Sequence, residues 1–476
     1  MTIRNLDALF RPRAVWFLGE PSGRGQAALL DRLGRQDTVV FRHARSELPP
    51  AASAQVPLAA IVADSRFATA ATITALGERG CRALLWPLDE PPAAEAMKAA
   101  RAFTMRILGP RTAGLATPSL GLDLTLLAQA PHRGSLALIT QSQSVAAAAV
   151  DWAAGRGIGF SLVAVVGGEA DVDVADLLDY VALDRHTSAV AIELGAIRGA
   201  RKFMSAARAC ARVKPTVVLQ TRTRDDAGAG ADPVRSAAFA RAGLVEVPTL
   251  PGLFDALAAL ERLPVIENGR VVVASNGTAL CGLAVDALIR QKLEVAAIPP
   301  EACAAIRAAV PQARFQAGAV DLGDPPADRL VTALGALSSI READAVLYVR
   351  SPTPDASHEE VAGALAAGLP RSRLLTVWLG LESALPARRR SAEARQPTFT
   401  SPDAAARALR YRYEYSHNRV LLTQTPPRMT ATVPDRKELA GMLDGDPVQV
   451  AAAYGVVTGA TQAEALRLEC EIDCHP

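Results

Sequence analysis

The sequence has 476 residues, of which 50% are hydrophobic and 4% aromatic, and its 51 basic residues nearly balance its 49 acidic ones. A chain of this length exceeds one ordinary core, so we expect about three domains. The net charge of +2 is spread along the chain, which disfavours nucleic acid or an anionic membrane as a partner. The sequence shows neither a signal peptide nor an uncharged apolar segment of about 20 residues, so we expect a cytoplasmic protein with no membrane contact.

Neither the cysteines nor the acidic runs predict a metal site. The six cysteines are scattered, as expected of buried thiols in a reducing compartment. The segment 470–475 holds two cysteines and a histidine, which is short of the roughly four ligands of a zinc site. The acidic run at 169–176 is better explained by a helix start, with Asp173 as N-cap and Asp176 as an acid of the first turn.

In chain order, short apolar runs alternate with Ala- and Leu-rich segments of helical period. This pattern is typical of parallel strands joined by crossover helices. The strands that we expect lie at residues 14–19, 38–41, 58–63, 82–87, 134–140, 160–167, 188–194, 215–220, 269–275, 345–350 and 374–380. They fall into three α/β blocks at residues 1–130, 131–265 and 266–420, followed by a Pro/Thr-rich linker and a short helical ending at 421–476.

A glycine-rich turn follows the first expected strand and precedes a helix, an arrangement that favours a phosphate-bearing ligand. The second strand offers a basic residue where NAD-binding folds carry an acidic one, so coenzyme A fits better than NAD. The alternative is an ordinary turn without a ligand. The residues that we assign to this CoA or acyl-CoA site are Gly19, Ser22, Gly23, Arg24, Gly25 and Arg42.

Two further strand-to-helix turns resemble each other and open the second and third blocks. One such turn is usually only a helix cap, but two at the heads of successive α/β blocks are placed to hold one anion from opposite sides. The anion-binding residues that we expect are Ser142, Gln143 and Ser144 in the first turn, and Asn276, Gly277 and Thr278 in the second.

The segment 221–243 follows a buried strand, where a catalytic loop is expected, yet it contains no obvious nucleophile. The chain has six histidines, and none lies between His186 and His358. No Ser/His/Asp or Cys/His arrangement can be assembled from the spacing.

Longer segments carry a family resemblance over most of the chain. The motifs "LDALFRPRAVWFLG", "ILGPRTAGLATPSLGL", "DWAAGRGIGF", "GGEADVDVADLLDYVALD" and "QPTFTSPDAAARAL" resemble signatures of the NDP-forming acyl-CoA synthetase superfamily. That superfamily includes succinyl-CoA ligase and ADP-forming acetyl-CoA synthetase. Within it, "TSAVAIELGAIRGARKFMSAARA", "GADPVRSAAFARAGLVEV", "SNGTALCGLAVDAL" and "EYSHNRVLLTQTP" are similar to the synthetase-like region of Pat-type bifunctional protein lysine acetyltransferases.

The resemblance implies a Rossmann-like CoA-binding domain followed by two flavodoxin-like domains of succinyl-CoA ligase type. In active members a loop histidine carries phosphate between the acyl-CoA half-site and an ATP-grasp domain. Here the matching loop, residues 221–233, lacks a histidine. The glutamate that steadies that histidine aligns with Gly195, and Glu193 on the same strand face is a partial substitute. The family's "GPN" asparagine is Arg111 here.

The C-terminal segment resembles the start of an ATP-grasp domain, so we expect no complete ATP site on this chain. The favoured hypothesis is a CoA- or acyl-CoA-binding protein with a regulatory or accessory role, without a catalytic histidine. Its expected partners are a CoA thioester and either a separate ATP-grasp subunit or an acetyltransferase, in a homo- or hetero-oligomer. The alternatives are the alpha-type subunit of an active ADP-forming acyl-CoA ligase, with Asp225, Asp226 or Asp232 as phosphate carrier, and a fold without a ligand.

Overall fold

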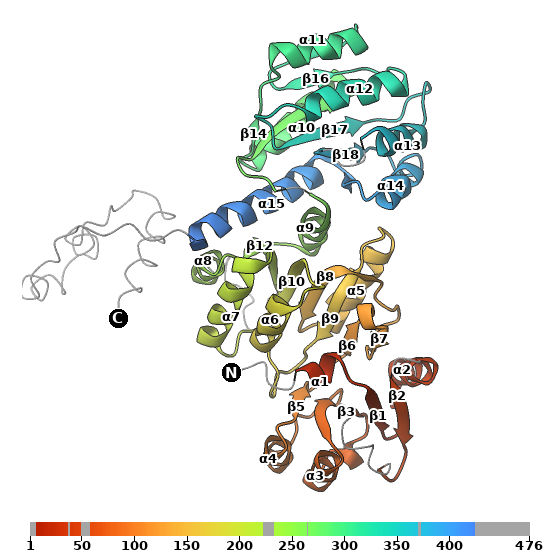
Figure 1. The fold of residues 1–476 in the computed structure, drawn as a ribbon, viewed down its shortest axis with the longest axis vertical. Coiled ribbons are helices and arrows are strands. Elements are labelled where there is room, and N and C mark those ends of the chain that lie inside the picture. Colours follow the sequence, from red (N-terminus) through yellow and green to blue (C-terminus); the bar gives the residue numbers. More distant parts are fainter. Residues whose placement is uncertain are drawn as a thin grey trace, which may run out of the picture.

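The computed structural model describes residues 6–36, 39–48, 58–221, 233–263, 265–369 and 373–423. These residues form three mainly parallel sheets with helices packed on them, which confirms the expected α/β class. Figure 1 shows the three units stacked along the long axis of the molecule. We call residues 7–108 the first unit, 114–262 the second unit and 270–399 the third unit.

The first unit is a five-stranded parallel sheet with the order β2-β1-β3-β4-β5. All residues of β1 and β3 are buried, as expected of parallel strands covered on both faces. Its elements are α1 (Asp7–Phe10), β1 (Ala14–Leu18), α2 (Arg24–Arg35), β2 (Val40–Ala44), β3 (Leu58–Val62), α3 (Ala70–Glu78), β4 (Cys81–Leu85), α4 (Ala94–Ala102) and β5 (Arg106–Leu108).

The strand β2 runs to Ala44, three residues beyond the expected end at Phe41. It does so because its backbone pairs along the whole of β1, from Ala14 opposite Val40 to Leu18 opposite Ala44. Arg42 therefore lies in the middle of a strand, not at its end.

The second unit is a seven-stranded sheet with the order β12-β11-β10-β8-β9-β6-β7. The edge strands β6 and β7 are antiparallel and precede the expected block start at residue 131. Its elements are β6 (Gly114–Thr117), β7 (Leu122–Asp123), β8 (Arg133–Thr140), α5 (Gln143–Ala154), β9 (Phe160–Val165), α6 (Val174–Leu183), β10 (Ala189–Leu194), α7 (Ala200–Val213), β11 (Thr216–Gln220), α8 (Pro233–Arg241), β12 (Val245–Val247) and α9 (Leu250–Arg262).

The third unit has the order β15-β16-β13-β17-β18-β19, with β14 also paired to β13. Its elements are β13 (Arg270–Ser275), α10 (Thr278–Arg290), β14 (Glu294–Val295), α11 (Pro300–Ala309), β15 (Arg314–Gln316), β16 (Ala319–Asp321), α12 (Ala327–Ser338), β17 (Ala345–Arg350), α13 (His358–Gly368), β18 (Leu374–Trp378), α14 (Ala384–Glu393) and β19 (Thr398–Phe399). The helix α15 (Pro402–Thr423) follows it. Beyond Thr423, the expected linker and helical ending lie outside the described residues.

One apolar core joins the second and third units. It contains residues of α5 and α9 from the second unit and of α10 from the third, together with α15, which crosses between the two units in Figure 1. Trp152 of α5 stacks on Phe254 of α9 with ring centroids 4.7 Å apart. None of the helices within the described residues has the length and apolarity needed to cross a lipid bilayer.

The acidic run at 169–176 starts a helix, as predicted. Asp173 is the N-cap of α6, and its side chain accepts a hydrogen bond from the main-chain nitrogen of Asp176 at 2.9 Å. Asp176 completes the capping box and also pairs with Arg106 of β5 at 2.7 Å. Because Arg106 belongs to the first unit, this buried ion pair fastens the first unit to the second.

Candidate functional site

The candidate site of the second unit centres on Glu193, which is 1% exposed. Glu193 is the fifth residue of β10 and lies on the same face as Ala189 and Ala191, which pack toward α5 and α9. The neighbours of β10 are β8 and β11, so the carboxyl ends of three parallel strands meet here. The crossover from β8 passes to one side of the sheet and that from β10 to the other, and such a switch point is where open α/β sheets bind ligands.

Four groups donate hydrogen bonds to the carboxylate of Glu193. Thr140 Oγ1 and the main-chain nitrogens of Gln141 and Ser142 lie 2.6, 3.0 and 3.1 Å from Oε2. Thr221 Oγ1 lies 2.5 Å from Oε1. Both carboxylate oxygens are therefore held by the turn before α5 and by the residue that follows β11. Charge-assisted bonds of this kind are the strong ones in a buried setting.

The expected anion-binding turn at Ser142 also caps α5. Ser142 is the N-cap, and its hydroxyl accepts a hydrogen bond from Val145 N at 3.3 Å. The hydroxyls of Ser142 and Ser144 lie 2.9 Å apart. Gln143 and Ser144 are exposed. Gln143 and Ser144 thus present their side chains to solvent, whereas the side chain of Ser142 caps the helix.

Gln141, which we did not assign to the site from the sequence, connects its loops. Its side-chain oxygen accepts hydrogen bonds from the main-chain nitrogens of Gly195 and Ala196 at 2.7 and 3.0 Å. Its side-chain nitrogen donates to Glu169 Oε1 at 2.9 Å. Burial raises the pKa of the Glu169 carboxyl, and hydrogen bonds from Gln141 and from the main chain of Val174 oppose that rise.

Gly195 and Glu193 face the same surroundings. A Cβ atom at Gly195 would lie 3.3 Å from Gln141 Oε1 and 3.7 Å from Thr221 Oγ1, and both of these residues are also among the neighbours of Glu193. This agrees with the alternation expected of a strand, in which residues two apart share a face. The loop at 222–232 that follows Thr221, with Asp225, Asp226 and Asp232, lies outside the described residues.

The corresponding turn of the third unit is tied down by its side chains. Asn276 donates to Ser351 O at 3.0 Å and accepts from Ser351 N at 3.0 Å. Thr278 Oγ1 donates to Asp321 Oδ2 at 2.6 Å. Gly277 is the N-cap of α10, and no side chain within the described part of the chain caps that helix. The first main-chain N–H groups of α10 thus remain the groups of this turn that are best placed to meet an anion.

A buried cation lies beside this turn and has no counterpart in the sequence prediction. Arg350, at the end of β17, is 0% exposed and pairs with Asp324, which also accepts a hydrogen bond from Thr353. Arg350 Nη2 donates to Thr353 Oγ1 at 3.0 Å and to Ala356 O at 2.9 Å. Although burial opposes it, hydrogen bonds from Arg350 and Thr353 lower the pKa of Asp324. The bonds of Arg350 lie within the third unit and hold its loops.

In the first unit, the glycine turn lies at the carboxyl end of β1. The sheet order places β2 and β3 on either side of β1, so the switch point of the sheet is the edge between β1 and β3. Gly19 has φ +103°, and a Cβ there would lie 2.2 Å from Asp64 Cβ. Only glycine fits that position. Gly23 is the extended N-cap of α2; among the described residues, no side chain caps the helix and a Cβ at Gly23 meets nothing within 4 Å.

The basic residues near this turn differ from the expected one. Arg42 is exposed in mid-strand, and its hydrogen bond goes to Phe41 O at 3.4 Å. His43 Nε2 lies 2.9 Å from Gly19 O, and Arg45 pairs with Glu20 of the turn at 3.5 Å. The longer extent of β2 explains the difference, because the strand ends at Ala44.

The comparisons with known proteins agree with this geometry. Residues 133–260 match the model of the succinyl-CoA ligase like flavodoxin domain. The acetate–CoA ligase [ADP-forming] I of Archaeoglobus fulgidus is 27% identical over 333 residues, which are 68% of this chain and 48% of that protein. The acetate–CoA ligase [ADP-forming] I subunit alpha of Pyrococcus furiosus is 33% identical over 210 residues, which are 42% of this chain and 45% of that subunit.

The chain is similar in sequence to ADP-forming acetate–CoA ligases. A solved structure of this kind, the dinucleotide-forming acetyl-coenzyme A synthetase 1 of Ca. Korarchaeum cryptofilum with phosphate and ADP, shares the fold with a TM-score of 0.80 at 22% identity. That likeness covers 88% of this chain and 98% of the solved chain. The chain spans about half the length of the curated proteins that it matches first.

Proposed function

We propose that the chain binds CoA or an acyl-CoA in its first unit, forms no phosphohistidine, and acts as a regulatory or accessory protein, as the synthetase-like region of Pat-type acetyltransferases does. The observation that carries the proposal is the state of Glu193. Its carboxylate accepts hydrogen bonds from Thr140, Gln141, Ser142 and Thr221. It is thus engaged within the fold, two residues before Gly195, the position that the resemblance aligns with the glutamate that steadies the histidine of the synthetases.

The histidines of the chain support the same proposal. None lies between residues 186 and 358 of the sequence. His186 precedes β10 and is therefore at the opposite end of that strand from Glu193. His358 is 2% exposed, and its Nε2 lies 3.0 Å from Leu379 O. Neither imidazole is placed to take up phosphate beside Glu193.

The first unit supports CoA as the ligand class. The turn from Gly19 to Gly25 joins β1 to the uncapped start of α2 at the switch point of the sheet. Free N–H groups and the helix dipole attract a pyrophosphate at such a turn. We extend the proposed site from Ser22, Arg24 and Arg42 to Arg45, because Arg45 reaches the turn. We also propose the domain boundaries expected from the sequence, at residues 1–130, 131–265, 266–420 and 421–476.

A calorimetric titration with CoA and acetyl-CoA tests the proposal. Gly23→Trp is the informative variant, because Gly23 has extended backbone that any residue adopts and open space in front of it. Gly34→Trp is the matched control, since Gly34 lies on the same helix, is exposed, and also has nothing within 4 Å of an added Cβ. Binding lost only in Gly23→Trp supports the proposal, and an unmodified protein without saturable binding refutes it.

A second candidate function is that of an alpha-type subunit of an active ADP-forming acyl-CoA ligase. The similarity to two alpha subunits from Pyrococcus furiosus, at 33% and 25% identity, favours it. It requires a phosphate carrier other than histidine. The test is to add a cognate ATP-grasp subunit and measure acyl-CoA-dependent phosphorylation of ADP. Turnover by the unmodified chain that depends on the added ATP-grasp subunit would establish this second function.

A further inference from the structure

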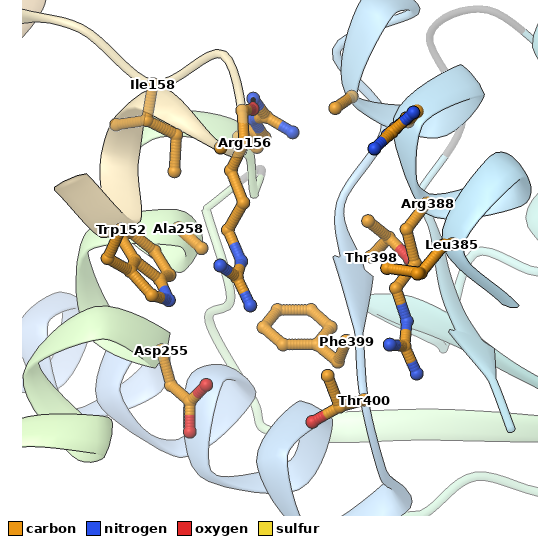
Figure 2. A pocket seen from close by; sticks show the side chains of 14 residues that line it. Trp152, Arg156, Ile158, Asp255, Ala258, Leu385, Arg388, Thr398, Phe399 and Thr400 are labelled. Carbon is orange, nitrogen blue, oxygen red and sulfur yellow. Dashed lines mark hydrogen bonds between the residues drawn. The ribbon is translucent and has the colours of Figure 1, made fainter. Parts of the chain in front are cut away.

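A cavity of about 220 Å³ lies between the second and third units. The C-terminal end of α5 and the helix α9 form one wall, and α14 with β19 forms the other. Figure 2 shows Trp152, Arg156 and Asp255 on one side of it, and Phe399 and Arg388 on the other. Its volume is below the roughly 300–1,000 Å³ of sites for drug-sized ligands, which limits any occupant to a small molecule.

The lining of this cavity is strongly basic. It contains four arginines, Arg156, Arg262, Arg388 and Arg389, and a single acid, Asp255. Asp255 Oδ2 accepts a hydrogen bond from Arg407 of α15 at 2.8 Å, and the charge of Asp255 also favours the charged form of the neighbouring Arg156. The lining therefore has an excess of positive charge in a partly enclosed space.

One of the four arginines has a structural role. Arg262 ends α9, donates to Arg156 O at 2.8 Å and pairs with Glu261 at 3.3 Å. Such contacts satisfy helix carbonyls and account for a basic residue at a helix C-terminus. These contacts account for Arg262 but not for Arg156, Arg388 and Arg389.

Arg156, Arg388 and Arg389 have guanidinium N–H groups without a hydrogen-bond partner among the described residues. The guanidinium of Arg156 stacks on Trp152, 4.5 Å from the ring centroid, and no hydrogen bond of that group is found in the described chain. Arg388 Nη2 donates to Trp378 O at 2.7 Å, but its Nε is buried without a partner. Burial lowers the pKa of both arginines, and for Arg156 the neighbouring Arg388 adds to the effect. A bound anion would relieve this repulsion.

The rest of the lining is suited to an apolar ring. Trp152, Ile158, Leu385 and Phe399 contribute apolar surface. Thr398 adds a hydroxyl whose oxygen is buried without a partner among the described residues. A monocarboxylate would neutralise only one of three guanidinium groups, whereas a phosphate monoester brings up to two negative charges.

The cavity is separate from the sites described above. It lies at the C-terminal end of α5, and Ser142 caps the other end of the same 12-residue helix. At 1.5 Å per residue the two ends are about 18 Å apart.

We propose that this cavity binds a phosphate monoester that carries a flat ring, held by Arg156, Arg388 and Arg389 between the second and third units. A ligand there contacts α5 and α14 at once, so its binding ties the second unit to the third.

Calorimetric titration of the full chain with adenosine monophosphate tests the inference, with adenosine and inorganic phosphate as partial probes. We expect saturable binding of the monophosphate that weakens about tenfold in Arg156→Gln and in Arg389→Gln. Arg389 is exposed, so its replacement leaves the fold intact. Arg389→Gln therefore remains informative even if Arg156→Gln, which removes the stack on Trp152, disturbs the fold. Arg390→Gln is the matched control, because Arg390 is exposed on the same helix, pairs with Glu393 at 3.5 Å, and does not line the cavity.

Each outcome decides the inference. Absence of monophosphate binding, equal binding of inorganic phosphate, or equal weakening in Arg390→Gln overturns it. The titration is repeated in Gly23→Trp, because CoA contains an adenine nucleotide that the proposed first-unit site would also recognise. Monophosphate binding that survives Gly23→Trp and weakens about tenfold in Arg389→Gln assigns the ligand to this cavity, independently of whether CoA binds the first unit. Binding lost in Gly23→Trp alone assigns it to the first unit and overturns the inference.

Discussion

The carboxylate of Glu193 lies 3.0 Å from the main-chain nitrogen of Gln141, across the boundary between β10 and the turn that starts α5. Because Glu193 is buried, this contact and its three companions replace the water that a free carboxylate would hold. Glu193 lies next to the candidate phosphate site at the start of α5, and its hydrogen bonds hold that site in place.

Replacement of Glu193 by Gln should therefore destabilise the fold. An amide has one acceptor oxygen in place of two and no charge, so it weakens the charge-assisted bonds from Thr140, Gln141 and Ser142. We expect a loss of about 2–3 kcal/mol in the free energy of unfolding, measured by urea denaturation. Glu246→Gln is the control, since Glu246 is partly exposed on the neighbouring strand β12. Equal stability of the two variants would show that the hydrogen bonds of Glu193 do not stabilise the fold.

Gly19 and Gly23 should respond differently to alanine. Gly19 has φ +103° and a Cβ there would meet Asp64 Cβ at 2.2 Å, whereas Gly23 has open space. We expect Gly19→Ala to cost at least about 2 kcal/mol of unfolding free energy, and Gly23→Ala, at a helix N-cap where glycine is preferred to alanine, to cost at most about 1 kcal/mol. Thermal and urea denaturation of both variants would check this. A tolerated Gly19→Ala would contradict the description of the turn.

Arg111 occupies a left-handed backbone conformation, with φ +54°. The family motif that it interrupts has an asparagine at this position, and asparagine adopts this region more readily than arginine does. Arg111→Asn should therefore raise the free energy of unfolding by about 0.5–1 kcal/mol. Arg341→Asn, at an exposed turn position without positive φ, should show no gain. A loss of stability in Arg111→Asn would mean that its side chain makes contacts that outweigh the strain.

The burial of Glu169 predicts a pH dependence. Its pKa is raised in the folded state, so its proton stabilises the fold at low pH, and this contribution is lost as the pH rises through the folded-state pKa. Glu169→Gln removes the titration. Its stability relative to the unmodified protein should increase from about pH 4 to about pH 7. A difference in unfolding free energy that stays constant over this range would contradict the raised pKa.

Local patterns in the sequence predicted the elements that depend on near neighbours. The apolar run at 58–63 gave a strand buried on both faces, and Asp173 with Asp176 gave a helix start. Short edge strands such as β7, with two residues, carry no pattern to recognise.

The contacts between distant segments were beyond such patterns. The turn near Gly19 depends on how far β2 extends, which is decided by its pairing with β1 and brings Arg45 to the turn. The cavity with Arg156 and Arg388 joins residues more than two hundred positions apart, and no local spacing relates them. For the same reason, the bonds from Gln141 to Gly195 and Glu169 became visible only in the structure.

The most direct test of the central claim is the calorimetric titration of the unmodified chain with acetyl-CoA, followed by the same titration of Gly23→Trp. The account predicts one saturable binding event that Gly23→Trp removes and Gly34→Trp retains. An unmodified protein that binds no acetyl-CoA, or a Gly23→Trp variant that binds it as tightly, would contradict a CoA site at the turn before α2.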